Sequence, residues 1–284
     1  MFRDYLRLTK PGIIFGNVVS VLGGFFLATR GSMDGQLLLA VLLGTSLVVA
    51  SSCVINNIID RDIDRHMQRT RNRALVLGTI SVRASWLYAV VLGVCGFMLL
   101  HLLANQLAVC FAALGVVVYV GLYTLHLKRR SVLQTVIGSI SGACPPVIGY
   151  CAVSGQFDLA ALILFMTFCI WQMPHSFGIA LYRLEDYRLA GIPVLPVSMG
   201  AQATKAQSLI YVVLFVLSGS LLYLAGYVNW VYLLVFLPVS AGWVYLAVQG
   251  FSAADDRLWA RRFYLYSILT ITLFSIAISV CHPY

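Results

Sequence analysis

Amide and carboxylate side chains gather at the end of one long uncharged stretch of the sequence. Asn57, Asp60 and Asp64 follow one another at spacings of three and four residues, which place them on one face of a helix. Asp62 points to another face. Two carboxylates one turn apart repel each other unless a cation lies between them, and Mg²⁺ prefers such oxygen ligands. The spacing therefore predicts a Mg²⁺ site at Asn57, Asp60 and Asp64.

Basic side chains follow this stripe. Arg69 and Arg73 stand in the next segment, and Lys128 opens a second basic run after Tyr123. Arginine beside a Mg²⁺ site suits a diphosphate, because a guanidinium binds phosphate oxygens through two parallel hydrogen bonds. The alternative is that these cations only orient the chain in a membrane and contact anionic lipid headgroups. That alternative does not explain the neighbouring carboxylates, so a metal–diphosphate site is the favoured interpretation.

A second polar cluster, formed by Tyr182, Arg183 and Asp186, stands at the end of a later uncharged stretch. Spacings of three and four residues allow these side chains to line one cavity. A structural salt bridge between Arg183 and Asp186 would explain the cluster equally well. All the clusters fall at corresponding ends of predicted helices, as one shared pocket requires.

His175 stands inside an uncharged stretch, four residues after Trp171 and directly after a proline. An ionisable side chain within a membrane-spanning helix is a candidate functional residue. The alternative is a hydrogen bond from His175 to a neighbouring helix, near the backbone gap that Pro174 leaves. The sequence leaves both interpretations open.

Two pairs of glycines four residues apart are typical of closely packed membrane helices. They are Gly12 with Gly16, and Gly138 with Gly142. We expect both pairs to lie at helix–helix contacts, and packing is the only role that we assign to them.

The elements that position these side chains must be membrane-spanning helices. Of the 284 residues, 61% are hydrophobic and only 10% are charged, whereas soluble proteins carry about 25% charged residues. This composition excludes most soluble enzyme folds. The stretches without a charged residue are 11–29, 35–59, 84–127, 131–157, 159–182, 206–254 and 263–281. A spanning helix needs about 20 residues, so the two longest stretches each hold two helices. The sequence predicts an all-α membrane protein of nine transmembrane helices, with residues 1–284 as a single domain.

The basic residues agree with this count. With nine spans, eighteen of the nineteen Lys and Arg residues fall on one side of the membrane, and Arg30 is the exception. The positive-inside rule places that side, with the N-terminus, in the bacterial cytoplasm, or in the matrix for a mitochondrial inner membrane. The C-terminus then lies outside. Because the net charge of +9 belongs to this membrane face, we expect no nucleic-acid partner.

These motifs resemble those of the intramembrane UbiA-type prenyltransferase superfamily. Its first aspartate-rich motif is similar to the pattern formed by Asn57, Asp60 and Asp64. Within the superfamily, the chain is most similar to the protohaem IX farnesyltransferases, and the resemblance covers nearly the whole chain. The segments that carry it are 10–17, 56–64, 69–73, 138–149, 171–175 and 186–196.

The resemblance implies a bundle of nine helices around a lipid-accessible central cavity. It also implies transfer of the farnesyl group of farnesyl diphosphate to the 2-vinyl group of haem B, with addition of water and with Mg²⁺ as cofactor, to give haem O and diphosphate. The implied catalytic and metal-binding residues are Asn57, Asp60, Asp64 and Asp186. The implied diphosphate-binding residues are Arg69, Arg73, Lys128 and Arg183. His175 would bind haem, and the aromatic faces that would stabilise the prenyl cation are those of Tyr123, Tyr182 and Trp171.

One position departs from the superfamily pattern, and two other functions remain open. The second motif usually begins with Asp, but Tyr182 stands there, so Asp186 is its only matching carboxylate. A quinone-type aromatic prenyltransferase would share the diphosphate site without needing an intramembrane histidine. A small membrane transporter would carry its polar groups near the membrane midplane, whereas here they gather at one face. We expect membrane lipid around the protein, and a haem A synthase or terminal oxidase as the receiver of the product.

Overall fold

The structure, a computed structural model, describes residues 2–29 and 33–282. This part of the chain consists of helices and connecting turns, without a β-strand. The elements are α1 (Phe2–Leu8), α2 (Pro11–Ala28), α3 (Gly35–Ile59), α4 (Arg61–Asp64), α5 (Ala74–Leu77), α6 (Val82–Leu103), α7 (Gln106–Val116), η1 (Val117–Leu127), α8 (Gln134–Ser154), α9 (Leu159–Tyr182), α10 (Leu184–Leu189), α11 (Leu195–Leu224), α12 (Trp230–Gln249), η2 (Gly250–Ser252) and α13 (Asp256–Val280). The predicted all-α fold is confirmed.

Nine helical segments of the described residues are long and apolar enough to cross a membrane. They are α2, α3, α6, α7 with η1, α8, α9, α11, α12 with η2, and α13. Each of the two longest uncharged stretches is divided between two of them, and an asparagine caps the start of the second helix of each pair. Asn105 accepts a hydrogen bond from the N–H of Ala108, and Asn229 accepts one from the N–H of Val231, both at 3.0 Å. The predicted count of nine spans is confirmed.

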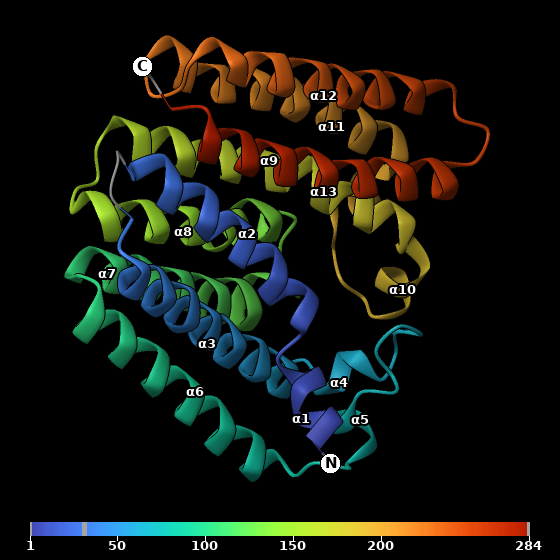
Figure 1. Cartoon of the computed structure of the whole chain (residues 1–284). Coiled ribbons are helices and arrows are strands. Elements are labelled where there is room, and N and C mark those ends of the chain that lie inside the picture. The colour runs from blue at the N-terminus through green and yellow to red at the C-terminus, as the bar shows by residue number, and fades with distance from the viewer. Residues whose placement is uncertain (1, 30–32, 283–284) are drawn as a thin grey trace.

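Helices α2 and α8 approach each other closely because a glycine stands at two of their contacts (Figure 1). A Cβ atom added to Gly24 would lie 1.8 Å from the carbonyl oxygen of Pro146. One added to Gly149 would lie 2.2 Å from the carbonyl oxygen of Val21. Any larger side chain would push the two helices apart at these positions.

The two glycine pairs predicted from the sequence differ from each other. A Cβ atom at Gly142 would lie 1.7 Å from the side-chain oxygen of Gln172, and one at Gly138 would lie 3.1 Å from the ring of Tyr123. This pair therefore lies at helix contacts, as expected. Within the described residues, no atom lies within 4 Å of a Cβ built at Gly12 or Gly16. The expectation was wrong there because the first half of α2 is largely exposed.

Aromatic side chains fill the core beside α9. The Phe215 ring of α11 lies 5.4 Å from Phe236, 5.6 Å from Trp243 and 5.9 Å from Phe274, measured between ring centroids. All four side chains are almost completely buried. Because Phe274 also packs on Phe168 of α9, at 5.9 Å, this cluster fixes α13 beside α9.

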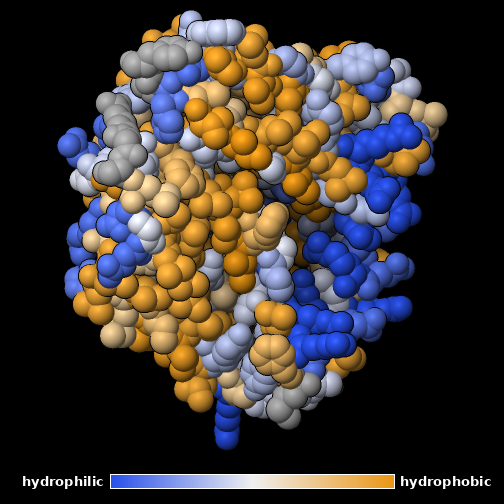
Figure 2. All heavy atoms as spheres, in the orientation of Figure 1, coloured by the Kyte–Doolittle hydropathy of each residue, from blue (hydrophilic) through white to orange (hydrophobic). Residues whose placement is uncertain are grey.

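The short helices gather at one end of the bundle, which we call the polar end. Figure 1 places α1, α4, α5 and α10 together there, and α13 finishes at the opposite end. Figure 2 shows hydrophilic side chains concentrated over the polar end, whereas hydrophobic side chains cover much of the flank. Arg30, the one basic residue predicted on the other side, lies outside the described residues. The gathering of hydrophilic residues expected from the sequence is thus visible at the polar end.

Candidate active site

The stripe of amide and carboxylate groups does not lie on one continuous helix. Helix α3 ends at Ile59, Asp60 adopts φ −83° and ψ 2°, and α4 begins at Arg61. The prediction of a single helical face is wrong because the backbone turns at Asp60. Asp60 and Asp64 nevertheless line one cavity of about 150 Å³, which we call the polar pocket, and they are 1% and 3% exposed. Its other lining residues are Lys10, Asn56, Met67, Arg69, Arg73, Tyr119, Tyr123, Lys128, Tyr187 and Ile192.

Asn56 lines the polar pocket, and Asn57 does not. The side-chain nitrogen of Asn56 donates to Asp60 Oδ2 at 2.8 Å and to Thr124 Oγ1 at 3.1 Å. Asn57 instead donates to the backbone carbonyl of Leu8 at 2.8 Å and so ties α1 to α3. On a helix of 3.6 residues per turn, a residue four positions back lies closer to the face of Asp60 than one three positions back. The predicted position of Asn57 on the pocket wall is therefore corrected to Asn56.

Each carboxylate of the polar pocket is paired with a cation. Arg73 Nη1 lies 2.5 Å from Asp64 Oδ2, and Lys128 Nζ pairs with Asp60 Oδ2. Arg69 lines the pocket as well. The structure thus brings together three of the four predicted cations, from segments about sixty residues apart, with two of the three predicted carboxylates.

Lys10 is a fourth cation of the polar pocket, and sequence reasoning missed it. Its Nζ donates to Asn56 Oδ1 at 2.5 Å, and its backbone has a left-handed conformation with φ 54°. Burial, together with the nearby charges of Arg73 and Lys128, lowers the pKa of Lys10 from 10.5 to about 8. Lys10 begins segment 10–17, one of those that carry the family resemblance, but its place directly before the first apolar stretch equally suits a residue at a membrane boundary.

Aromatic side chains complete the wall of the polar pocket. Tyr119 and Tyr123 stack with ring centroids 5.7 Å apart and ring planes at 12°. Both belong to η1, a π-helix whose last bond runs from the Lys128 N–H to the carbonyl of Tyr123, five residues back. Such segments are frequent at functional sites. Tyr187 of α10 also lines the pocket, and burial raises its pKa. Tyr123 was predicted, whereas Tyr119 and Tyr187 do not stand out among the many aromatic residues.

The second predicted cluster is divided between two places. Asp186 is buried and accepts a hydrogen bond from the backbone N–H of Gln68 at 2.9 Å, which holds α10 to the segment between α4 and α5. Tyr182 and Arg183 do not line the polar pocket. The guanidinium carbon of Arg183 lies 4.5 Å from the centroid of the Tyr182 ring. Because α9 ends at Tyr182, helical spacing does not hold across this turn, and the predicted common cavity is corrected.

His175 and Trp171 lie on α9 and contact α13. His175 Nδ1 is 2.7 Å from Ser267 Oγ, and Trp171 Nε1 donates to the Ser267 carbonyl at 2.9 Å. The two rings stack with centroids 4.7 Å apart. The hydrogen bond to a neighbouring helix, considered as the alternative for His175, is thus present. His175 also forms a hydrogen bond with the backbone of Tyr264, and its side chain is only partly exposed.

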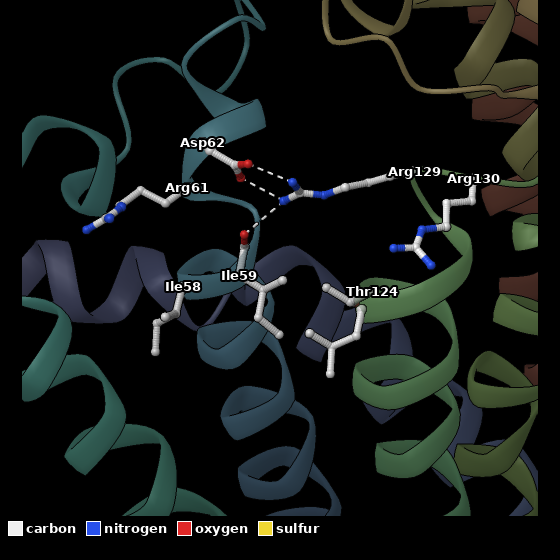
Figure 3. Close-up of a pocket in the computed structure, with 8 residues that line it drawn as sticks. Ile58, Ile59, Arg61, Asp62, Thr124, Arg129 and Arg130 are labelled. Carbon is white, nitrogen blue, oxygen red and sulfur yellow. Dashed lines mark hydrogen bonds and ion pairs between the residues drawn. The ribbon is translucent and has the colours of Figure 1, made fainter.

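Asp62 lies outside the polar pocket, as its spacing predicts. Its carboxylate binds the Arg129 guanidinium through contacts of 2.6 and 2.7 Å, and this pairing lowers the pKa of Asp62 and raises that of Arg129. The pair lines a separate hollow of about 430 Å³. Figure 3 shows Ile59 and Thr124 below the pair. No residue lines both the hollow and the polar pocket.

The polar pocket suits a hard cation together with an anionic ligand. Asp60 Oδ1 is buried and has no hydrogen-bond partner in residues 2–29 and 33–282. Mg²⁺ is commonly held by one or two protein carboxylates and completed by water and phosphate oxygens. The described residues contain no group of three or more His, Cys, Asp or Glu side chains that could hold a metal. A metal at Asp60 and Asp64 would therefore need further oxygen ligands, which a diphosphate supplies.

Known proteins match the chain over nearly its whole length. A profile of the UbiA prenyltransferase family matches residues 17–269. A protein of Sodalis glossinidius named protoheme IX farnesyltransferase is 55% identical over 281 residues, and the match covers 99% of this chain and 95% of that protein. A protein of the same name from Acinetobacter baumannii is 57% identical over 281 residues, with 98% of this chain and 96% of that protein covered.

Solved structures share the fold. A digeranylgeranylglyceryl phosphate synthase superposes with a TM-score of 0.80 at 20% identity, covering 99% of this chain and 98% of that one. A UbiA homolog from Archaeoglobus fulgidus, bound to GPP and Mg²⁺, superposes with a TM-score of 0.71 at 19% identity, covering 98% of this chain and 100% of that one. At such low identity these likenesses establish the fold alone.

Proposed function

Because the chain belongs to the UbiA prenyltransferase family, it is a prenyltransferase, and we propose that it transfers the farnesyl group of farnesyl diphosphate to the 2-vinyl group of haem B. Water adds in the same reaction, and the products are haem O and diphosphate. The observation that carries the proposal is the polar pocket, where two carboxylates and four cations meet at the polar end of a membrane-spanning bundle. Nearly full-length similarity to proteins named protoheme IX farnesyltransferase supports this donor and acceptor.

The cations of the polar pocket would bind the diphosphate. The four cations are Lys10, Arg69, Arg73 and Lys128. They exceed the charges of Asp60 and Asp64 by two, so the pocket attracts an anion even while two of its cations are paired with carboxylates. Arg183, predicted as a further diphosphate ligand, lies outside this pocket and leaves the proposed set.

The carboxylates of the polar pocket would hold the metal. Bound at Asp60 and Asp64, Mg²⁺ would neutralise charge on the departing diphosphate. The solved homolog bound to GPP and Mg²⁺ supports a metal-dependent reaction. Asn57 and Asp186 are the other ligands proposed from the sequence, and hydrogen bonds to Leu8 and Gln68 engage their side chains. Asn56 is a better-placed amide, because it contacts Asp60 directly.

The polar pocket would also protect the reacting carbon. The C1–O bond of farnesyl diphosphate breaks, and its electron pair leaves with the diphosphate. The outer vinyl carbon of haem bonds to C1, and water adds to the inner carbon and loses a proton. The stacked rings of Tyr119 and Tyr123 would stabilise the allylic cation, and the pocket wall that they form would limit premature hydrolysis. Trp171 and Tyr182, also predicted for this role, lie outside the pocket on α9.

His175 would bind the haem iron or orient the macrocycle. Its hydrogen bond to Ser267 fixes the imidazole ring, as partners of metal-binding histidines commonly do. A His175→Ala variant is expected to change the absorption spectrum of bound haem and to lower turnover. If both stay unchanged, this role for His175 is wrong.

One incubation tests the proposed reaction. Purified protein is mixed with haem B, farnesyl diphosphate and Mg²⁺, and haem O is sought by mass spectrometry, with a known farnesyltransferase as the positive control. Haem O is expected only when haem B, farnesyl diphosphate and Mg²⁺ are all present with the protein. No haem O beside an active control would refute the proposal, and prenylation of an aromatic quinone precursor instead would establish the quinone-type alternative. Family membership argues against the small-transporter alternative.

The orientation and surroundings of the enzyme follow from the same proposal. The polar end, with the N-terminus, would face the cytoplasm from the bacterial inner membrane, or the matrix in a mitochondrion, and the C-terminus would lie outside. The chain would act as one domain embedded in lipid. A haem A synthase or a terminal oxidase would receive the haem O.

A further inference from the structure

Two arginines converge on one tyrosine ring at the polar end. The guanidinium carbon of Arg183, directly after α9, lies 4.5 Å from the centroid of the Tyr182 ring. That of Arg257, in the first turn of α13, lies 5.5 Å from the same centroid. An aromatic ring stabilises a cation only modestly, so the Tyr182 ring does not neutralise the two guanidinium charges. The arrangement therefore calls for negative charge.

The neighbouring acidic side chains have other partners. Glu185 forms an ion pair with Arg188 at 2.8 Å, and Asp256 forms one with Lys205 at 2.5 Å. Asp186 accepts a hydrogen bond from the N–H of Gln68 at 2.9 Å. Asp255 accepts hydrogen bonds from two N–H groups at the start of α13, at 2.8 and 3.0 Å. Within residues 2–29 and 33–282, neither Arg183 nor Arg257 forms an ion pair. The two guanidinium groups are thus free to bind two anionic groups of a ligand.

An aromatic strip extends from these arginines toward the membrane interior. The Tyr182 ring lies 5.6 Å from Tyr264, which lies 6.4 Å from His175, and His175 stacks on Trp171 at 4.7 Å. All four side chains are partly exposed. The eleven residue-to-residue steps from Trp171 to Tyr182 rise about 16 Å along α9. The strip is therefore long enough for a flat ligand of about the width of a macrocycle.

The strip and the polar pocket meet at the same turn of the chain. Arg183 follows α9, and Tyr187, four residues later on α10, lines the polar pocket. Between them, Asp186 holds the segment that supplies Arg69 to that pocket. A ligand on the strip would thus have its charged edge close to the region that binds the diphosphate.

We propose that Arg183 and Arg257 bind the two propionate carboxylates of the haem acceptor, with the macrocycle along the strip of Tyr182, Tyr264 and His175. Haem B is an apolar plate with two carboxylates on one edge, which matches an apolar aromatic strip with two arginines at one end. Guanidinium–carboxylate contacts would hold the propionate edge of the macrocycle at the membrane surface. This inference rests on the proposed function, because it assumes that haem is the acceptor.

Steady-state kinetics of four variants test the arginines. Arg183→Gln and Arg257→Gln should each raise the KM for haem B by about tenfold, the effect of one lost charge-assisted hydrogen bond, and leave the KM for farnesyl diphosphate within about twofold. Arg183→Lys and Arg257→Lys should recover part of the loss. Matched controls are Arg188→Gln near α10 and Arg262→Gln on α13, which should leave both KM values unchanged.

Haem B dimethyl ester, whose propionates carry no charge, separates recognition of carboxylates from a structural effect. The wild-type protein should have a KM at least about tenfold higher for the ester than for haem B. In the Arg183→Gln/Arg257→Gln double variant this preference should disappear. The wild-type comparison is informative even if the double variant fails to fold.

Three results would overturn the inference. The first is use of the ester by the wild-type protein as readily as haem B, the second is an equal rise of the KM for both acceptors in the variants, and the third is a rise of the KM for farnesyl diphosphate in Arg183→Gln. In each case haem O is still formed, so the proposed function survives. Absence of haem O with the wild-type protein would remove both the proposed function and this inference.

Discussion

The two carboxylates of the polar pocket differ from Asp62 in what surrounds them. Asp60 and Asp64 are buried beside cations, and Asp60 Oδ1 lacks a hydrogen-bond partner among the described residues. The Asp62 side chain is 64% exposed and binds Arg129 on the outer surface. Since the three residues lie within five positions of the sequence, replacement of Asp by Asn can be compared between the polar pocket and the outer surface.

Asp60→Asn and Asp64→Asn should each lower kcat for haem O formation by roughly 100-fold, because each removes a charge that would hold Mg²⁺ on the diphosphate. Asp62→Asn should stay within about threefold of the wild type, since exposed ion pairs contribute little. Initial rates at saturating Mg²⁺ measure the effect. An equal loss of kcat in all three variants would show that lining the polar pocket does not distinguish Asp60 and Asp64 from Asp62 in catalysis.

Asn56 and Asn57 provide a second comparison. Asn56→Ala should lower kcat/KM for farnesyl diphosphate by about tenfold, because its amide contacts Asp60 and Lys10 in the polar pocket. Asn57→Ala should mainly lower the free energy of unfolding, by about 1 kcal/mol, through loss of its bond to Leu8. Kinetics and thermal unfolding in detergent distinguish the two. The reverse pattern would restore Asn57 as the residue of the site.

Spacing and resemblance together located Asp60, Asp64, Arg73 and Lys128, because charged residues are rare enough in this chain to stand out. They did not separate Asn56 from Asn57. Adjacent residues on a helix differ by about 100° in direction, so the choice depends on where α3 ends. That end is fixed by the turn at Asp60, which the sequence pattern did not reveal.

At the scale of elements, contacts between spans depend on which glycine meets a neighbouring backbone. The sequence pattern of small residues four apart identified Gly138 and Gly142 but also Gly12 and Gly16, which touch nothing in the described structure. It missed the contact of Gly24 with Pro146. A pattern along one helix cannot specify the partner, because the partner comes from a segment more than a hundred residues away.

Gly24→Ala should destabilise the protein by about 1–3 kcal/mol, since its Cβ would lie 1.8 Å from a backbone oxygen and would force α2 and α8 apart. Gly16→Ala on the same helix is the matched control, with no atom within 4 Å. It should be neutral or slightly stabilising, because alanine favours helix. Thermal unfolding in detergent measures both. Similar destabilisation of the two variants would contradict the packing argument.

At the scale of the whole molecule, the absence of charge predicted the architecture. A polar residue in hydrocarbon is so unfavourable that long uncharged stretches mark membrane spans. The structure divides the two longest stretches at the helix starts that Asn105 and Asn229 cap. How the spans bring Lys10, Asp64 and Lys128 to one pocket does not follow from hydropathy. Those contacts depend on the packing of helices around α8.

Cysteine labelling tests the proposed orientation. In inverted inner-membrane vesicles, Leu189→Cys on α10 should react with a charged maleimide added outside, because the cytoplasmic face is exposed there. Gln156→Cys, exposed between α8 and α9, should react only in right-side-out vesicles. The two exposed native cysteines, Cys95 and Cys110, lie within spans and should stay unlabelled in lipid. If Leu189→Cys reacted only in right-side-out vesicles and Gln156→Cys only in inverted ones, the proposed orientation would be wrong.

The left-handed backbone of Lys10 has a consequence for how this sequence can vary. Lys10 is the only residue other than glycine with positive φ in the described part of the chain, and such a conformation costs about 1 kcal/mol or more. Its side chain also lines the polar pocket together with three other cations. A library randomised at position 10 and selected only for folding should therefore enrich glycine or asparagine, whereas selection for haem O synthesis should retain lysine. Comparison of the two enrichments would separate what the fold tolerates from what the reaction requires.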